Sequence, residues 1–421
     1  MQTRSAVGRW PISRLATPGV LDELPPRLRP DAGLGVLDIT KYFGTTSGGI
    51  KTYLLEKARY VGSRPKLRQV MVLPGAEDDV ATGDGSRTYR LRGPRIPAHE
   101  PYRFLLATRS LRRILEHESP DLIEVGSPFL VPWLTKLANR HLQAPMVWYY
   151  HSHLPRLAMP DPATGSFAQH ATSRLLSRYV SFLGDQFPVV FCASQFSASA
   201  LAEQGVKRVL RVPLGVDVYH FTHDRREHQC ATRQHAGLSS GPVALFAGRF
   251  ATEKRLEVIL EAWPEVERRT GCRLALLGGG PAAESLRRHR HANRVTWLPW
   301  EGDRERFADL LAAVDVYVAP GPAETFGLSA LEAMASGTPV LSVDSGAVSE
   351  LVARGDAGLL YADGSVDSVI ESATRLLSDD LAATGARARR LAEREHAWDH
   401  VLGQLFARYG DLVEGRPLPF E

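Results

Sequence analysis

Two glutamates eight positions apart, Glu324 and Glu332, are the first candidates for chemistry in this sequence of 421 residues. They belong to the segment APGPAETFGLSALEAMASGTPVLS, residues 319–342. An apolar run typical of a strand precedes the loop GPAETFG, and LSALEAMAS has the pattern of a helix that ends at Gly337. Glu324 is therefore expected in the loop and Glu332 on the helix. Because different elements carry the two carboxylates, they need not act on one atom.

Several roles are open to this pair from the residues alone. A metal site is disfavoured, because no His lies near these carboxylates in the sequence. The backbone amides of Phe326, Gly327 and Leu328 would form a helix N-terminus, which attracts phosphate. Glu332, one turn farther along, could then accept hydrogen bonds from a ribose diol. The alternative is that Glu332 is an ordinary charge on a solvated helix face.

Two cations, Arg249 and Lys254, follow another strand-like run in the segment GRFATEK, residues 248–254. A leaving nucleoside diphosphate develops negative charge as its glycosidic bond breaks, and fixed cations stabilise that charge. These two side chains could supply it without a metal. The alternative is that both are ordinary charges at the start of a helix.

The segment FGTTSGGIKTY, residues 43–53, invites comparison with a phosphate-binding P-loop. A Walker A loop needs Lys directly after its last Gly, but here Ile50 separates Gly49 from Lys51. One inserted residue turns the Lys by about 100° on a helix. A kinase or ATPase is therefore not indicated, and Gly48 and Gly49 could instead form a plain turn between a strand and a helix.

Three further segments follow strand-like runs. His151 and His153, in VWYYHSHLPR, are spaced for a metal, but no third ligand is evident near them, and such His residues are more often structural. Gly279 lies in LGGGP, which lacks the G-x-G-x-x-G spacing of a dinucleotide site. Leu298 lies in VTWLPW, where Trp297 and Trp300 are equally typical of a core.

The segment ETFGLSALE resembles the E-x7-E motif of the family 4 retaining glycosyltransferases. Other blocks similar to that family follow in order along residues 34–409, and they are GGIKTYL, YYHSH, VVFCASQFSA, VPLGVDVYHF, FAGRFATEKRLEVILEAW, LALLGGGP and VTWLPW. The resemblance implies a GT-B fold, in which two Rossmann-like domains face each other across a cleft and the second holds most of the nucleotide sugar.

The resemblance also implies roles for individual residues. Glu324 and His151 would contact the donor sugar, and Glu332 would bind the ribose. Arg249 and Lys254 would neutralise the diphosphate. Backbone at Gly48 and Gly49 would approach the diphosphate and the acceptor. The remaining donor-binding candidates are Phe326, Gly327, Leu328, Gly279 and Leu298, and no metal or other cofactor is expected.

The elements that must position these residues form two alternating α/β series. Apolar runs of strand length recur between helical segments up to residue 194, and the alternation restarts after Gly241. Each series predicts a buried parallel sheet, and such sheets bind ligands at the carboxyl ends of their strands. We therefore expect a tail (1–33), a first domain on the acceptor side (34–215), a linker (216–240), a nucleotide-sugar domain (241–395) and a helical segment that packs back on the first domain (396–421).

Composition excludes several classes of protein. No apolar run reaches the roughly 18 residues that span a bilayer, and the N-terminus lacks the pattern of a secretory signal. The 3 Cys residues are far apart, which fits neither a disulfide framework nor a zinc knuckle. A cytoplasmic enzyme is expected. The net charge of +4 conceals an asymmetry, because residues 1–215 hold 28 Lys and Arg against 17 Asp and Glu.

The resulting hypothesis is a retaining hexosyltransferase that uses UDP- or GDP-hexose and a lipid, lipid-linked or glycan acceptor. The alternatives are a catalytically silent protein of the same fold that binds nucleotide sugar or glycan, a soluble small-molecule glycosyltransferase, an epimerase and a glycogen-type phosphorylase. No nucleic-acid module is present among the motifs.

The excess of cations in the first domain also suggests a docking surface. Cations gather in residues 51–68 and again in residues 103–113, where they alternate with apolar residues. Solvated helix faces are the alternative. If these faces flank the acceptor site, the first domain would dock on anionic lipid at the inner face of the membrane.

Overall fold

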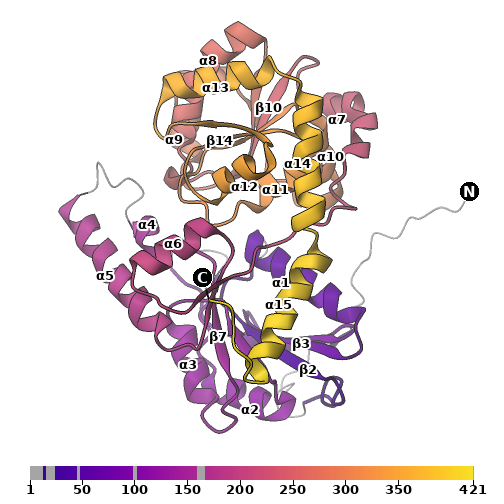
Figure 1. Ribbon diagram of the computed structural model, residues 1–421, viewed down its shortest axis with the longest axis vertical. Helices are drawn as coiled ribbons and strands as arrows, with labels where there is room; N and C mark the ends of the chain where they lie inside the picture. Colours follow the sequence, from indigo (N-terminus) through magenta and orange to yellow (C-terminus); the bar gives the residue numbers. More distant parts are fainter. Residues whose placement is uncertain (1–12, 16–23, 45–47, 98–101, 159–165, 421) are drawn as a thin grey trace, which may run out of the picture.

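The computed structural model describes residues 13–15, 24–44, 48–97, 102–158 and 166–420 (Figure 1). Two separate β-sheets divide the chain, and the predicted pair of α/β domains with Rossmann-like parallel sheets is confirmed. Residues 1–12 and 16–23 of the expected tail, and the part 45–47 of the glycine-rich loop, lie outside the described residues.

The first domain is built on a nine-stranded sheet with the order β1-β4-β5-β3-β2-β6-β7-β8-β9. Its pairings are parallel except those of β4 with β1 and β5. The strands are β1 (Ser13–Leu15), β2 (Leu34–Ile39), β3 (Leu67–Gly75), β4 (Asp79–Thr82), β5 (Ser86–Arg92), β6 (Leu122–Val125), β7 (Met146–Tyr150), β8 (Val190–Cys192) and β9 (Val209–Arg211). Its helices are α1 (Gly49–Gly62), α2 (Thr108–Glu118), α3 (Leu130–Ala138), α4 (Leu154–Ala158), α5 (Phe167–Gly184) and α6 (Gln195–Glu203).

The second domain is built on a six-stranded sheet with the order β12-β11-β10-β13-β14-β15, in which every pairing is parallel. The strands are β10 (Val243–Arg249), β11 (Arg273–Gly279), β12 (Thr296–Leu298), β13 (Val316–Ala319), β14 (Val340–Val343) and β15 (Gly358–Tyr361). The α-helices are α7 (Gln229–His235), α8 (Leu256–Thr270), α9 (Ala283–Arg287), α10 (Arg304–Ala313), α11 (Leu328–Ala335), α12 (Ala347–Gly355), α13 (Val366–Leu377) and α14 (Leu381–Glu395), and the 3-10 helices are η1 (His223–His228), η2 (Thr252–Lys254) and η3 (Ala292–Arg294).

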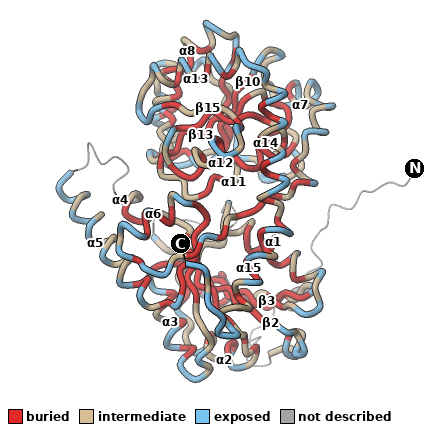
Figure 2. Tube along the Cα trace, viewed as in Figure 1, coloured by how far each residue is buried: buried red, intermediate tan, exposed pale blue. Residues whose placement is uncertain are grey.

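Apolar strands of both sheets are buried between helices, as parallel sheets require. Most residues of the central strands are red in Figure 2, whereas the outer faces of the helices are exposed. One core cluster fills the first domain and another the second. A third cluster runs through both domains and joins them.

Residues 216–240 connect the two sheets, but most of this segment is folded onto the second domain. It contains η1 and α7, both of which contact α10. Arg225 pairs with Glu305 and Asp309 at 2.6 Å each, and Arg233 pairs with Asp315 at 2.6 Å. The low apolar content of residues 216–240 predicted a linker. It instead reflects short helices that ion pairs attach to the second domain.

The last helix, α15 (Trp398–Val413), returns the chain to the first domain and packs on α1 (Figure 1). The rings of Phe406 and Tyr60 stack at a centroid distance of 5.4 Å. The chain therefore crosses between the domains twice, and the two crossings lie side by side, because Val216 and Ala397 form a parallel β-bridge.

Candidate functional site

The second sheet changes direction of growth at β10, since β11 and β12 lie on one side of it and β13 to β15 on the other. Such a switch point leaves a crevice at the carboxyl ends of the two central strands. The loop after β10 carries Lys254, and the loop after β13 carries Glu324. Their side chains form an ion pair across this crevice, with exposed fractions of 24% and 30%.

Gly321 makes room for this ion pair. A Cβ added at Gly321 would lie 3.2 Å from Cδ and 3.7 Å from Nζ of Lys254. A side chain at this position would crowd the Lys254 chain, and glycine leaves it room. The local backbone therefore positions the ammonium group at the switch point.

Arg249 ends β10 next to Gly279 at the end of β11, and the two residues are partners in the sheet register. The neighbouring Gly280 has a φ of +146°, and a Cβ there would lie 2.5 Å from the carbonyl oxygen of Phe250. This glycine allows the two loops to pack closely. Arg249 remains 64% exposed and pairs with Glu253 at 2.9 Å. Its positive charge acts on the first domain as well. Burial raises the pKa of the Tyr102 hydroxyl, and the nearby Arg249 partly offsets this rise.

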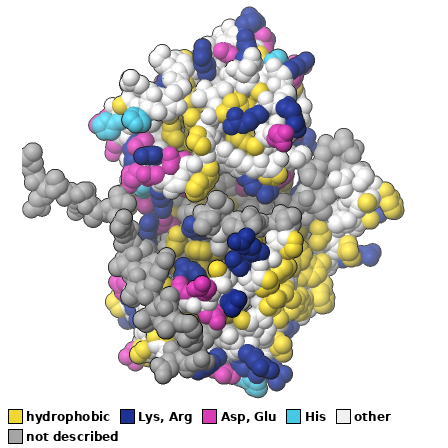
Figure 3. Space-filling model, turned by 180° about the vertical axis from the view of Figure 1, so that it is seen from behind, with side chains coloured by type: hydrophobic (Ala, Val, Ile, Leu, Met, Phe, Trp, Pro, Cys, Tyr) yellow, Lys and Arg dark blue, Asp and Glu magenta, His cyan; other side chains and the backbone are white. Residues whose placement is uncertain are grey.

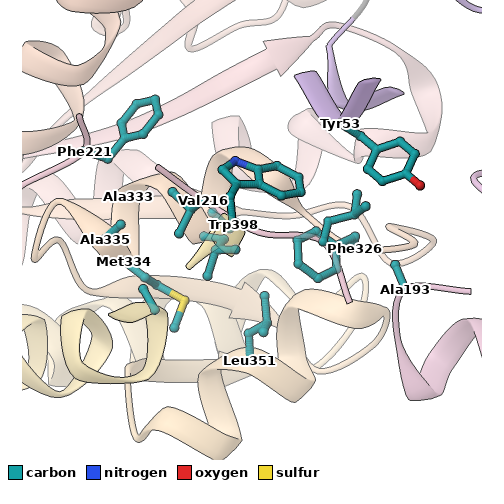
Figure 4. Packing of buried hydrophobic residues seen from close by; sticks show 14 of the residues in the cluster. Tyr53, Ala193, Val216, Phe221, Phe326, Ala333, Met334, Ala335, Leu351 and Trp398 are labelled. Atoms are coloured by element: carbon teal, nitrogen blue, oxygen red, sulfur yellow. The ribbon is translucent and has the colours of Figure 1, made fainter. Parts of the chain in front are cut away.

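The N-terminus of α11 lies beside Glu324. Gly327 is its N-cap residue, Leu328 begins the helix, and no side chain within the described part of the chain caps it. The amides of this turn are therefore available for an anion. The side chain of Phe326 has a different role, because it is buried and packs 5.9 Å from the ring of His396. Figure 4 shows it in the apolar cluster with Trp398 and Ala193, so only its backbone belongs to the candidate site.

Glu332 is buried rather than solvated, which excludes the alternative of a surface charge. Burial raises its pKa to about 8, while Arg304 opposes the shift and Glu56 adds to it. Arg304 and Glu56 form an ion pair of 2.7 Å between the two domains. Without a ligand, the Glu332 carboxyl is therefore mostly protonated at neutral pH.

This pKa leads to a testable pH dependence of nucleotide binding. If Glu332 accepts hydrogen bonds from a ribose diol, binding favours the ionised carboxylate, so affinity should rise by up to about tenfold per pH unit as the pH increases toward 8. Above pH 8 the affinity should level off. Glu332→Gln should remove this dependence. Isothermal titration calorimetry between pH 6 and 9 measures it, and an equally steep dependence in Glu332→Gln would contradict the role of Glu332.

His151 lies at the end of β7 in the first domain. Its ring stacks on Tyr149 with centroids 4.4 Å apart, and burial lowers its pKa to about 3, so it is a neutral donor or acceptor. Its carbonyl oxygen accepts a hydrogen bond of 2.9 Å from Thr325 Oγ1. Thr325 follows Glu324 directly, so the structure brings the His151 loop and the Glu324 loop together between the domains.

Gly48 and Gly49 begin α1, and a Cβ on either would meet no atom within 4 Å. This opening of α1 adjoins a cavity of about 10 Å³, the space of about one water molecule. The cavity is lined by Asp38, Ile39, Thr40, Ile50, Leu54, Glu124, Gly126 and His151. Ile50, which follows the two glycines, and His151 therefore line the same cavity on the first domain.

Leu298 lies farther out than the other candidates, since β12 is the edge strand and is separated from β10 by β11. It is half-buried at the carboxyl edge of the sheet, as is Gly279. The nearby Trp297 packs inward against Phe250 at 6.0 Å and donates to the carbonyl of Ala292 at 2.9 Å. Of the predicted residues in the second domain, Leu298 is on the strand farthest from the switch point.

Several contacts between the domains were not predicted from the sequence. Thr325 accepts a hydrogen bond from Ser194 at 2.8 Å through its carbonyl oxygen. Glu350 on α12 accepts hydrogen bonds from the backbone amides of Gln195 and Phe196, at the N-terminus of α6. Thr325 sits inside the E-x7-E segment and could have been noticed there. Glu350 carries no local signal, because its partners are backbone groups 154 and 155 positions away.

No group of three or more His, Cys, Asp or Glu side chains suited to a metal ion occurs in the described portion of the chain. Among the same residues, no helix is both long enough and apolar enough to cross a bilayer.

Comparison with known families identifies the two domains. Residues 47–220 match the model described as Glycosyltransferase Family 4, and residues 241–379 match the model described as Glycosyl transferases group 1. This chain belongs to glycosyltransferase family 4. The predicted resemblance is confirmed, and this family 4 glycosyltransferase is an enzyme that transfers a sugar from a nucleotide sugar.

Curated relatives are similar to this glycosyltransferase over nearly its whole length. A GDP-mannose-dependent alpha-(1-6)-phosphatidylinositol dimannoside mannosyltransferase of Mycobacterium tuberculosis is 29% identical over 387 residues, 90% of this chain and 96% of the relative. A GDP-mannose-dependent alpha-(1-6)-phosphatidylinositol monomannoside mannosyltransferase of the same species is 28% identical and covers 90% and 98%.

Solved structures show the same fold. Sucrose-phosphate synthase from Thermosynechococcus elongatus superimposes with a TM-score of 0.72 at 20% identity, covering 91% of this chain and all of the other. HepE from Anabaena, solved with UDP and glucose, gives a TM-score of 0.68 at 18% identity, covering 89% and 99%. The fold predicted for this glycosyltransferase, GT-B, is confirmed.

Proposed function

We propose that this glycosyltransferase transfers a mannosyl residue from GDP-mannose to a glycolipid acceptor, with retention of configuration at the sugar. The observation that carries this proposal is the Lys254–Glu324 ion pair at the switch point, beside the uncapped N-terminus of α11. The choice of donor is supported by relatives of nearly full length that are named as GDP-mannose-dependent. The choice of acceptor is supported by two of those names, which specify phosphatidylinositol mannosides.

In this proposal, the leaving diphosphate is bound by Lys254, Arg249 and the amides that open α11. Lys254 would exchange its contact with Glu324 for the diphosphate. Glu324 would then be available for the hydroxyls of the sugar, with His151 on the opposite wall. Glu332 would hold the ribose. A donor phosphate oxygen would take the proton of the acceptor hydroxyl, so the reaction needs no dedicated protein base.

Transfer should not require a divalent metal, because protein cations supply the positive charge at the diphosphate. We expect purified protein to retain full activity in excess EDTA. The measurement is the rate of mannosyl transfer before and after chelation. Complete loss that added Mg²⁺ or Mn²⁺ restores would show that Arg249 and Lys254 do not suffice.

The donor is tested with radiolabelled GDP-mannose, GDP-fucose, UDP-glucose and UDP-galactose, each with vesicles that contain phosphatidylinositol mannosides. Label from GDP-mannose should appear in the lipid phase and resist β-mannosidase but not α-mannosidase. Nucleotide binding without turnover of any donor would instead indicate a silent binding protein. Transfer only to a soluble sugar would favour a small-molecule glycosyltransferase.

A glycolipid acceptor also suggests the place of action. We propose that the protein works in the cytoplasm at the inner face of the membrane, where nucleotide sugars and lipid headgroups meet. It would associate with that face peripherally, and nucleic acid would not be a partner, since none of the motifs belongs to a nucleic-acid module.

A further inference from the structure

The helices α3 and α5 expose an unusual share of apolar surface. Eleven large apolar side chains are exposed among the described residues, and six of them lie on α3, on α5 or directly before α3. These six, which we call the α3/α5 face, are Phe129, Leu130, Leu137, Phe167, Leu175 and Phe182. Soluble proteins rarely leave such a group uncovered unless it serves an interaction.

The α3/α5 face is continuous. The rings of Trp133 and Phe182 stack at 5.5 Å, and those of Phe129 and Tyr179 stack at 5.8 Å, so the two helices lie side by side. Figure 3 shows hydrophobic side chains gathered along the flank of the first domain on this side of the molecule. The apolar residues thus form one surface and not scattered points.

The outer stripe of α5 combines apolar and cationic residues. At 100° per residue, the exposed large apolar and cationic side chains of this helix fall within about 100° of arc. They are Phe167, Arg174, Leu175, Arg178 and Phe182. Phe167 is 90% exposed and Leu175 is 67% exposed. Neither α3 nor α5 contains an Asp or Glu.

The α3/α5 face begins at the acceptor side of the site. Phe129 lies under the ammonium of Lys41, whose Nζ is 5.4 Å from the ring centroid. Lys41 donates through its backbone to Ser127 Oγ at 2.9 Å, and the same oxygen is 2.9 Å from Oγ1 of Thr40. Thr40 and His151 line the same cavity. The apolar face is therefore continuous with the first-domain loops that would receive an acceptor.

We propose that the α3/α5 face docks this enzyme on an anionic lipid bilayer. Phenylalanine and leucine would enter the boundary between headgroups and acyl chains, while Arg174 and Arg178 would contact lipid phosphates. A second copy of the chain fits less well. A two-fold interface would bring the same face of both copies together and enclose these arginines, with no acidic residue on either helix to compensate. The statement that this membrane also supplies the acceptor rests on the proposed function. The docking itself does not depend on it.

This surface differs from the cationic segments singled out in the sequence. Two residues of the first segment, Lys57 and Arg68, are buried and bound to partners inside the first domain, so they cannot meet lipid. In the second segment, Leu106 just before α2 and Arg109 on α2 are exposed. It supplies a matched control for the α3/α5 face.

Cosedimentation with vesicles tests the proposal. The full chain is mixed with phosphatidylcholine vesicles that contain or lack phosphatidylinositol. Wild type should pellet with the anionic vesicles and less with neutral ones. Replacing Phe167, Leu175 and Phe182 by Ser together should lower the apparent affinity at least about tenfold. Arg174→Gln with Arg178→Gln should reduce the preference for anionic lipid. Leu106→Ser with Arg109→Gln should bind like wild type.

Three outcomes would overturn the proposal. The first is equal pelleting of wild type and the triple serine variant, and the second is loss of pelleting only in the Leu106→Ser, Arg109→Gln control. The third is a wild-type dimer that the triple serine variant dissociates, without any vesicle binding, which would identify a second copy as the occupant. These assays involve no turnover, so they separate this proposal from the proposed function. If both hold, the triple serine variant should transfer mannose normally to a deacylated acceptor and poorly to the same headgroup in vesicles.

Discussion

Lys254→Ala is expected to lower kcat/KM for the nucleotide sugar by about 30- to 1,000-fold. The substitution removes one charge-assisted contact to the leaving diphosphate, which contributes about 2 to 4 kcal/mol to transition-state stabilisation. It also leaves Glu324 without its partner in the switch-point crevice, and that carboxylate would then repel the donor. Initial rates over a range of donor concentrations measure the effect.

The control for this experiment is Lys66→Ala, which removes an exposed Lys from the first domain. It should keep wild-type kinetics. Circular dichroism should show that Lys254→Ala is folded, since Lys254 belongs to a short 3-10 helix and not to the core. Wild-type turnover in folded Lys254→Ala protein would place the diphosphate elsewhere.

Lys57→Met should destabilise the first domain strongly. Lys57 is fully buried, with its Nζ 2.6 Å from Asp38 and 3.5 Å from Glu124. Breaking a buried ion pair on one side costs about 3 to 5 kcal/mol, because the remaining charge is left uncompensated. For a domain of this size the Tm should fall by about 10 °C.

The same substitution has a defined pH dependence. Burial raises the pKa of Glu124 to about 7, and Lys57 counteracts this rise. A carboxyl whose pKa is raised by folding loses stability as the pH increases above its unfolded value. Without Lys57 the pKa of Glu124 rises further, so the deficit should be larger at pH 8 than at pH 5. Calorimetry of Lys57→Met beside Lys66→Met measures both effects, and equal Tm values for the two variants would contradict the network.

The fold could be predicted because its signals are local. Short apolar runs followed by Gly-rich loops and helical patterns identify parallel α/β units, and the order of blocks in the sequence identified the family. The pairing of Lys254 with Glu324 also lies within reach of the sequence, since both residues follow adjacent central strands.

Other parts of the site depend on tertiary burial, which the local pattern did not reveal. Phe326 precedes α11 and Glu332 follows its helix pattern, yet the side chain of the first packs between the domains and the second is buried with a raised pKa. Lys57 and Arg68 look like surface cations because charge is normally solvated. The partners of Lys57 come from strands and from α15, as far away as Tyr409, whose hydroxyl is 2.9 Å from the Lys57 ammonium. Arg68 donates to the carbonyl oxygens of Glu118 and Ser119 at the end of α2.

The return of α15 to the first domain affects the order in which the chain can fold during synthesis. Tyr409 contributes to the buried network of Lys57, and Phe406 packs on Tyr60. Once residues 241–395 have left the ribosome, the second domain can close its own sheet, but the first domain still lacks the helix that completes its interior. The domain translated first is therefore finished last, and until release its buried Lys and carboxylates are partly open to water and to chaperones.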